Sequence, residues 1–306
     1  MKKTMMTLCA LGLMFAGCSK QSGTDNPLLQ EWDTPFQTAP FEKIKVEHYL
    51  PAFEAAMEEH NKEIQAIIDN SEEPTFENTI AALDYSGQTL SKVAGVFYNM
   101  MAANTSEELQ KVNEKIGPLM ATHSDNVSMN AKLFEKIKAV YDAKDSQNYT
   151  GEQLALLEKT YNKFVRSGAL LDAAKQEELR KVNAELTKVE AKFDANLLKE
   201  TKAYQLIVEK EEDLKGLPQG EIEKAAALAK SEGKEGKWIF TLDNPSFIPF
   251  VTYADNRDLR KEIFLARTNR CNNGGETDNN ALVAQMAELR AQKAQILGYE
   301  TFAHYQ

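Results

Sequence analysis

The chain has 306 residues, of which 42% are hydrophobic and 27% are charged, and its formal net charge is −10. This balance allows the chain to bury a large core, so the chain need not be disordered. It also argues against a nucleic-acid partner, because phosphate binding requires a basic stripe that this acidic sequence lacks. The sequence contains no GxxxxGK[ST] loop, no CxxC pair and no GxSxG motif.

Residues 1–17 have the pattern of a secretory signal peptide. Two lysines precede an apolar run at 5–16, which is too short to remain as a membrane-spanning helix. The sequence Phe-Ala-Gly-Cys that ends at Cys18 resembles the bacterial lipobox, whose cysteine is acylated after cleavage. We therefore predict lipidation at Cys18, and an ordinary signal peptide with a chance cysteine is the alternative.

A lipid anchor predicts a protein of the cell envelope. The mature chain would be acidic and repelled by anionic headgroups, so we expect the lipid to be its only attachment to the membrane. Ser19 stands where an Asp favours retention in the inner membrane, which points to the outer membrane with the protein facing the periplasm. Residues 18–40 are predicted to form a polar tether and an extended segment.

Only one of the three cysteines, Cys271, would remain as a thiol in the mature chain. Cys9 leaves with the signal and Cys18 is acylated, so no internal disulfide is possible even in an oxidising compartment. Cys271 lies in a predicted loop without a nearby histidine to activate it. We interpret it as an incidental loop cysteine.

Residues 41–202 are predicted to be a helical domain, because their apolar residues recur at spacings of three and four. The first helix is expected to start near His48, since Pro51 fits only near a first turn. The apolar positions from Phe76 to Met100 predict one continuous second helix.

Capping signals divide the rest of this domain. A capping box from Thr105 to Glu108 predicts a third helix that ends near Met120, and another helix is expected at 130–143. A second box at Thr150 opens the next helix. Asp172 is predicted to cap the longest helix, and six helices in sequence indicate a bundle or a curved wall.

Residues 203–306 are predicted to add a small α/β element before the chain becomes helical again. Strands are expected at 204–209 and 238–242 with a helix at 219–231 between them, and parallel pairing would make this a βαβ unit. A short helix from Pro245 to Tyr253 is apolar all round and is expected to be buried.

The last predicted elements are an arginine-rich helix from Arg257 to Arg270 and an amphipathic helix over 277–297. A further helical pattern begins at Tyr299 and stops at Gln306 without a cap. We therefore expect the sequence to be part of a longer protein.

Three motifs resemble one family of enzymes. The stretch from Lys237 to Cys271 carries an Asn-Pro-x-Phe…Arg…Phe-x-Ala…Arg pattern, residues 74–80 read Pro-Thr-Phe-Glu-Asn-Thr-Ile, and residues 292–299 end in Ile-Leu-Gly-Tyr. Together they resemble the thimet oligopeptidase, oligopeptidase A and dipeptidyl carboxypeptidase family of zinc metallopeptidases. Ser86-Gly87 and the surroundings of His123 look closest to the dipeptidyl carboxypeptidase branch.

The resemblance implies a mainly α-helical, two-sided molecule with a deep channel, of which this chain supplies one wall. The whole protein would cleave short peptides and release C-terminal dipeptides. The sequence does not determine the oligomeric state, and a monomer is the favoured expectation. In the family, zinc is bound by an HExxH motif and a later Glu, and both lie beyond the part that this sequence resembles.

The sequence itself offers no zinc ligands of that kind. A zinc site of this type needs two histidines four residues apart on a helix, and His48, His60, His123 and His304 are never so spaced. We expect solvated or packing roles for the first three. We assign no catalytic and no metal-binding residue to this chain, because its acidic residues follow amphipathic helix faces.

Two other interpretations remain open at this point. The chain could be a non-catalytic helical lipoprotein that binds peptides or a protein partner, or it could be a purely structural helical spacer. Zinc content and peptide titration separate these from the peptidase interpretation.

Overall fold

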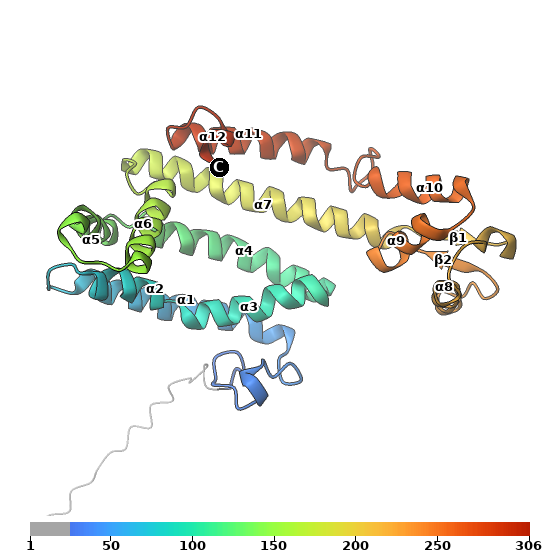
Figure 1. The fold of residues 1–306 in the computed structure, drawn as a ribbon, viewed down its shortest axis with the longest axis horizontal. Coiled ribbons are helices and arrows are strands. Elements are labelled where there is room, and N and C mark those ends of the chain that lie inside the picture. Colours follow the sequence, from blue (N-terminus) through green and yellow to red (C-terminus); the bar gives the residue numbers. More distant parts are fainter. Residues whose placement is uncertain (1–24) are drawn as a thin grey trace, which may run out of the picture.

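The computed structural model describes residues 25–306 and shows an elongated, mainly helical molecule (Figure 1). The predicted signal peptide and Cys18 lie outside the described residues. The longer elements are the helices α1 (Val46–Asp69), α3 (Gln88–Ala103), α4 (Glu107–Ser128), α5 (Ala131–Asp142), α6 (Gly151–Arg166), α7 (Ala173–Ala203), α8 (Gln219–Ser231), α9 (Asn244–Tyr253), α10 (Arg257–Thr268) and α11 (Asn280–Ile296).

The shorter elements are η1 (Pro35–Gln37), η2 (Phe76–Ala81), α2 (Ala82–Tyr85), η3 (Lys144–Ser146), β1 (Leu206–Val208), η4 (Glu211–Leu214), β2 (Trp238–Phe240) and α12 (Phe302–Tyr305). The prediction of a mainly α-helical chain is therefore confirmed. Across residues 25–306, every helix is too short or too polar to cross a bilayer.

Helix α1 begins at Val46, earlier than the predicted start near His48. The reason is His48 itself, whose Nδ1 accepts the backbone N–H of Lys45 at 3.0 Å and so satisfies one of the open donors of the first turn. Pro51 is accommodated inside the helix, although it removes one backbone hydrogen bond. Burial of the neighbouring Phe53, which is 0% exposed, offsets that loss.

The predicted continuous second helix is wrong, because the chain breaks at Ser86 and Gly87. Residues 76–85 form a π-helical turn followed by the short helix α2, and α3 starts afresh after Gly87. Gly87 has φ +70°, a conformation that costs little only for glycine. A Cβ at this position would also lie 3.2 Å from the His60 ring, so the break fits closely against α1.

The third helix differs from its prediction at both ends. Ser106, and not Thr105, is the N-cap, and its side chain accepts the Leu109 N–H at 3.2 Å. The helix continues through Pro118 to Ser128. The predicted caps at Thr150 and Asp172 are confirmed.

Helix α7 is the spine of the molecule, with α4 along one side and α11 along the other (Figure 1). Its contacts combine a small apolar cluster with polar side-chain pairs. Asn183 of α7 donates to Asp125 of α4 at 3.0 Å, and Glu190 of α7 pairs with Arg290 of α11 at 2.7 Å. The far end of α7 leads into the small sheet, so the spine connects the helical bundle to the α/β element.

The expected parallel βαβ unit is wrong, because β1 and β2 pair antiparallel. Leu206 lies opposite Phe240, and Val208 lies opposite Trp238. The chain therefore enters β2 at the same end of the sheet at which it leaves β1. Parallel sheets are stable when helices cover both faces. Two strands of three residues are too small for that, and α8 packs mainly against β2.

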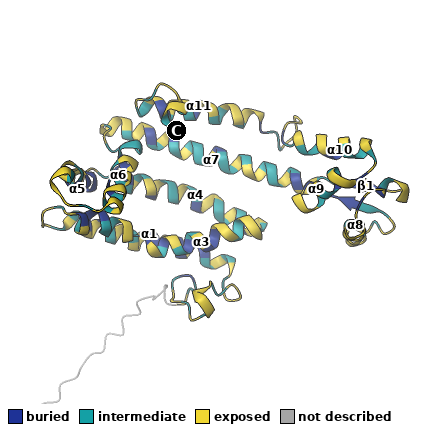
Figure 2. Ribbon diagram, viewed as in Figure 1, coloured by how far each residue is buried: buried dark blue, intermediate teal, exposed yellow. Residues whose placement is uncertain are grey.

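Helix α9 was expected to be buried all round, and this is wrong. Phe247 and Phe250 are buried beside Ile263 of α10, whereas Ile248 and Tyr253 are each 52% exposed. The neighbouring helix covers one side of α9 and leaves the other open, as the burial colouring also shows (Figure 2).

Candidate functional site

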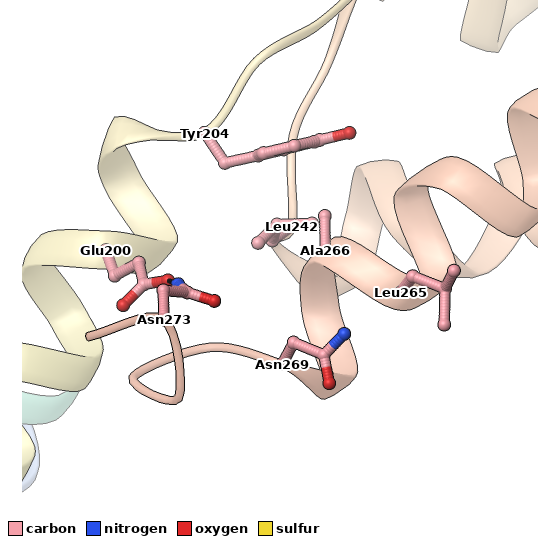
Figure 3. Close-up of a pocket in the computed structure, with 7 residues that line it drawn as sticks. All are labelled: Glu200, Tyr204, Leu242, Leu265, Ala266, Asn269 and Asn273. Carbon is pink, nitrogen blue, oxygen red and sulfur yellow. Dashed lines mark hydrogen bonds between the residues drawn. The ribbon is translucent and has the colours of Figure 1, made fainter. Parts of the chain in front are cut away.

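A pocket of about 280 Å³ lies where the end of α7 meets α10 and the loop after it (Figure 3). Three chain segments that are distant in sequence form it, because the sheet returns the chain from α7 to α10. The residues that line the pocket are Glu200, Tyr204, Leu242, Leu265, Ala266, Asn269 and Asn273.

Glu200 fixes the loop that forms one wall of this pocket. Its Oε2 accepts the Cys271 backbone N–H at 2.7 Å and the Thr277 hydroxyl at 3.0 Å, and its Oε1 accepts the Asn273 amide. Both carboxylate oxygens are thus occupied by hydrogen-bond donors of the loop. Glu200 therefore holds the loop in place and is poorly suited to act as a general base.

A buried asparagine anchors the other end of the loop. Asn279 is 3% exposed, and its Oδ1 accepts from Asn196 at 2.8 Å while its Nδ2 donates to the Phe193 carbonyl at 3.1 Å. Its backbone N–H reaches back to the Cys271 carbonyl at 2.8 Å. The loop is therefore tied to α7 at two points.

Tyr204 contributes an unpaired hydroxyl to the pocket region. Burial, together with the negative charge of Glu262, raises the pKa of Tyr204 to about 12, so the phenol keeps its proton at neutral pH. Its buried Oη has no hydrogen-bond partner among residues 25–306. A buried polar atom without a partner costs free energy, so this hydroxyl is a ready donor for a bound water or ligand.

Cys271 is unreactive in this arrangement. It is 5% exposed, and burial followed by the hydrogen bond to Glu200 raises the pKa of its thiol to about 11. A thiol that keeps its proton at neutral pH is a poor nucleophile. Its backbone φ is +57°, so the residue forms the sharp turn at which α10 gives way to the loop.

A second polar cluster joins α1, α4 and the break before α3. His60 Nδ1 lies 2.9 Å from His123 Nε2, and His60 Nε2 lies 3.1 Å from Ser86 Oγ. The Ser86 hydroxyl donates to the Leu83 carbonyl at 2.7 Å, so it can only accept from His60. His60 therefore carries its proton on Nε2, and its Nδ1 accepts the N–H of His123.

In this hydrogen-bond arrangement the His60 nitrogen beside Ser86 holds a proton, so it is not poised to act as the base of a Ser–His pair. Burial lowers the pKa of His60, an effect that Glu63 opposes and Lys163 reinforces. Burial and then the charge of His60 lower the pKa of His123. The two histidines thus form a neutral, hydrogen-bonded link between helices, in keeping with the packing role expected for them.

Zinc does not fit the side chains that the structure describes. Within residues 25–306, the His, Cys, Asp and Glu side chains form no group of three or more that could hold a metal ion. His48 caps α1, His60 and His123 pair with each other, and His304 contacts Thr301 near the end of the chain. No catalytic step through a metal can be derived for these residues.

The pocket residues were not found from the sequence. Glu200 is one of 46 acidic residues, and Tyr204 stands at a helix–strand junction that gives no chemical signal of its own. The one usable signal was the run of asparagines between 269 and 280, which is typical of a loop held by side-chain hydrogen bonds.

Comparison of the sequence with known proteins identifies related peptidases. Residues 250–306 match the model of Peptidase family M3. Over 280 residues, or 92% of this chain, the sequence is 33% identical to the dipeptidyl carboxypeptidase of Escherichia coli strain K12. It is 30% identical over 93% of the chain to an organellar oligopeptidase A of Arabidopsis thaliana, and 29% identical over 91% to the oligopeptidase A of E. coli.

The chain is thus a member of a family of peptidases, which are hydrolases. It belongs to the thimet oligopeptidase and dipeptidyl carboxypeptidase family, as its motifs predicted. It spans 41%, 36% and 41% of the three relatives, so the alignment covers about two fifths of their length.

Proposed function

We propose that this chain is the amino-terminal portion of a zinc metallopeptidase that cleaves short peptides and releases C-terminal dipeptides. The observation that carries the proposal is the pattern of coverage. Almost the whole chain aligns with about two fifths of each peptidase, and the match to the family model begins only at residue 250.

In this proposal the helices supply a channel wall that limits the size of the substrate. The wall would consist of the bundle around α1, α3 and α4 with α7 and α11 beside it (Figure 1). The sequence has no HExxH motif, which supports a catalytic centre and zinc ligands elsewhere in the full protein. The 306-residue chain would then be inactive by itself and would bind short peptides as a monomer.

Release of dipeptides tests the enzymatic part of the proposal. The purified chain is incubated with N-acylated tripeptides to pentapeptides and zinc, and the products are followed by mass spectrometry. We expect no dipeptide from this chain alone, and the E. coli dipeptidyl carboxypeptidase serves as the positive control. Dipeptide release that a chelator abolishes would contradict the assignment of catalysis to another part.

We also propose that Cys18 anchors the protein to the outer membrane, facing the periplasm. The support is the lipobox pattern at 15–18. Cys18→Ala should leave the protein unacylated, with processing insensitive to globomycin and with the protein absent from the membrane fraction. Unchanged processing and fractionation in this variant would contradict the anchor.

A further inference from the structure

The loop between α10 and α11 contains an asparagine that is followed directly by a glycine. Asn273-Gly274 is the one Asn-Gly pair in the 306-residue sequence. Both residues are exposed, and Gly274 has φ +71°. Among residues 25–306, no atom beyond the adjoining residues lies within 4 Å of the place that a Cβ on Gly274 would occupy. The backbone at this pair is therefore open to solvent and uncrowded.

An asparagine and the residue after it can react with each other. The Gly274 backbone nitrogen bonds to Cγ of Asn273 and closes a five-membered ring, and the bond from Cγ to the side-chain nitrogen breaks. The proton of Gly274 ends on that nitrogen, which leaves as ammonia. Water then opens the ring at one of its two carbonyl groups and yields aspartate or isoaspartate, with no change of oxidation state. Glycine favours the closure because it has no Cβ to obstruct it.

Two hydrogen bonds hold the reacting groups in the folded loop. The Asn273 side-chain amide donates to Glu200 Oε1 on α7, and Figure 3 shows these two side chains next to each other. The Gly274 N–H donates to Asp278 Oδ2 at 2.8 Å, which closes the loop on itself. Both bonds must break before the nitrogen attacks, so the reaction proceeds when the loop opens locally. Such opening costs little free energy in an exposed loop.

We propose that Asn273 is a site of spontaneous deamidation, and that its conversion to a carboxylate releases this end of the loop from α7. The bond to Glu200 needs a donor, and an ionised carboxylate at position 273 has none. Two carboxylates would face each other there and repel. Where isoaspartate forms, the backbone gains one carbon atom, which also shifts the Gly274 N–H relative to Asp278.

The release would be partial, because the loop has other attachments to α7. The Cys271 N–H and the Thr277 hydroxyl still donate to Glu200 Oε2, and Asn279 keeps its bonds to Asn196 and the Phe193 carbonyl. Deamidation therefore loosens the pocket wall that Asn273 forms and leaves α11 in place.

The neighbouring asparagines are poorer substrates for this reaction. Asn269, Asn272 and Asn280 are also exposed, but each precedes a residue whose Cβ hinders ring closure. The proposal depends on the loop alone, so it stands or fails separately from the peptidase activity.

Ageing of the folded 306-residue chain tests the proposal. The protein is incubated at mildly alkaline and mildly acidic pH and digested, and mass spectrometry locates each deamidation by its gain of about one dalton. We expect Asn273 to react well ahead of Asn269, Asn272 and Asn280, and faster at alkaline pH because the Gly274 nitrogen must lose a proton. Amide exchange over 271–277 should then be about tenfold faster in the aged protein, since the closed loop has lost a hydrogen bond to a charged group.

Variants separate the reaction from its consequence. Asn273→Asp should show the faster exchange without ageing, and Gly274→Ala should suppress the deamidation. Asn272→Asp is the matched control, because it adds the same charge one residue away and its carboxylate can still accept from the Asn280 amide. Reaction at Asn273 no faster than at Asn272 would overturn the proposal, and so would equal exchange rates in Asn273→Asp and Asn272→Asp.

Discussion

Two helix contacts in this molecule are stabilised by different interactions. One joins α1, α3 and α4, and the other joins α7 and α11. The first buries large apolar side chains completely, including Phe53, Phe97 and Ile116, and the Phe53 and Phe97 rings meet edge to face at 5.5 Å. The second has a smaller apolar cluster, in which Val182, Val189 and Leu289 are buried and Leu186, Leu282, Met286 and Ile296 are partly buried. Figure 2 shows the difference as dark blue along α1 and α3.

Hydrogen bonds between polar side chains add to the weaker apolar contact between α7 and α11. Gln285 of α11 donates to Glu185 of α7 at 3.0 Å, and Asn196 of α7 donates to Asn279 at 2.8 Å. Such bonds replace bonds to water, so each contributes about 1 kcal/mol net, whereas a fully buried large side chain contributes about 1.5–3 kcal/mol. Two helix contacts of similar appearance therefore differ in strength.

The largest effect is expected in the apolar contact. Phe97→Ala should lower the free energy of unfolding by about 3–5 kcal/mol, because it removes a completely buried ring and leaves a cavity. Leu289→Ala, in the smaller cluster, should cost about 2 kcal/mol. Urea unfolding followed by circular dichroism gives both values, and Phe36→Ala, at a ring that is 99% exposed, should cost less than about 0.5 kcal/mol. An equal cost at the two buried sites would refute the comparison.

A smaller effect is expected at the polar anchor of α11. Asn279→Ala should cost about 1–3 kcal/mol, because it leaves the Asn196 amide and the Phe193 carbonyl without their partner. It should also speed amide exchange in the loop at 271–279. Asn269→Ala, at an exposed asparagine just before the loop, is the control. If both variants exchange alike, the anchor lies elsewhere.

The histidine link adds a pH dependence to the bundle. Burial lowers the pKa of both His60 and His123 below about 6.5, the value in an unfolded chain. Between the lowered pKa values and about pH 6.5, the unfolded chain binds more protons than the folded chain does. The stabilisation is therefore fully present above about pH 6.5 and is lost as the pH falls through the lowered pKa values of the folded chain. A proton added to Nδ1 of His60 would also point at the N–H of His123, so the hydrogen bond between the two rings would be lost.

Unfolding titrations at about pH 7.5 and about pH 5 measure this dependence. The double variant His60→Gln, His123→Gln should lose stability less steeply as the pH falls than the parent does. His304→Gln, at an exposed histidine, should behave like the parent. The pH account fails if the double variant and the parent have the same slope.

The smallest effect is expected at the ion pair between α7 and α11. Arg290 and Glu190 are 41% and 43% exposed, so solvent screens their attraction. Arg290→Gln should cost about 0.2–1 kcal/mol, and the difference should shrink in high salt. A loss as large as that of Leu289→Ala would mean that charge, and not burial, holds α11 to the spine.

The helical character of the chain was predictable because apolar residues recur regularly and the caps are explicit. Thr150 and Asp172 each show the side-chain pattern that the structure uses. Helix interruptions were harder to predict, because the break at Ser86 and Gly87 is packed against His60 on α1. That contact joins residues far apart in sequence, and local periodicity carries no information about it.

Contacts between residues far apart in sequence also explain why the strand direction, the exposed side of α9 and the pocket were not predicted. The two strands pair across about thirty residues of intervening chain, and the exposure of Ile248 and Tyr253 depends on which side of α9 is covered by α10. Glu200 acquires its role only when the loop after α10 returns to the end of α7. The family, by contrast, was readable from motifs, since these are short and ordered along the chain.

Zinc stoichiometry is the most direct test of the claim that the catalytic centre is not formed by these 306 residues. The folded chain is equilibrated with a small excess of zinc, passed through a desalting column and analysed for bound metal. The account predicts far less than one zinc per chain. Retention of one tightly bound zinc per chain, lost when histidines of this chain are replaced, would contradict it.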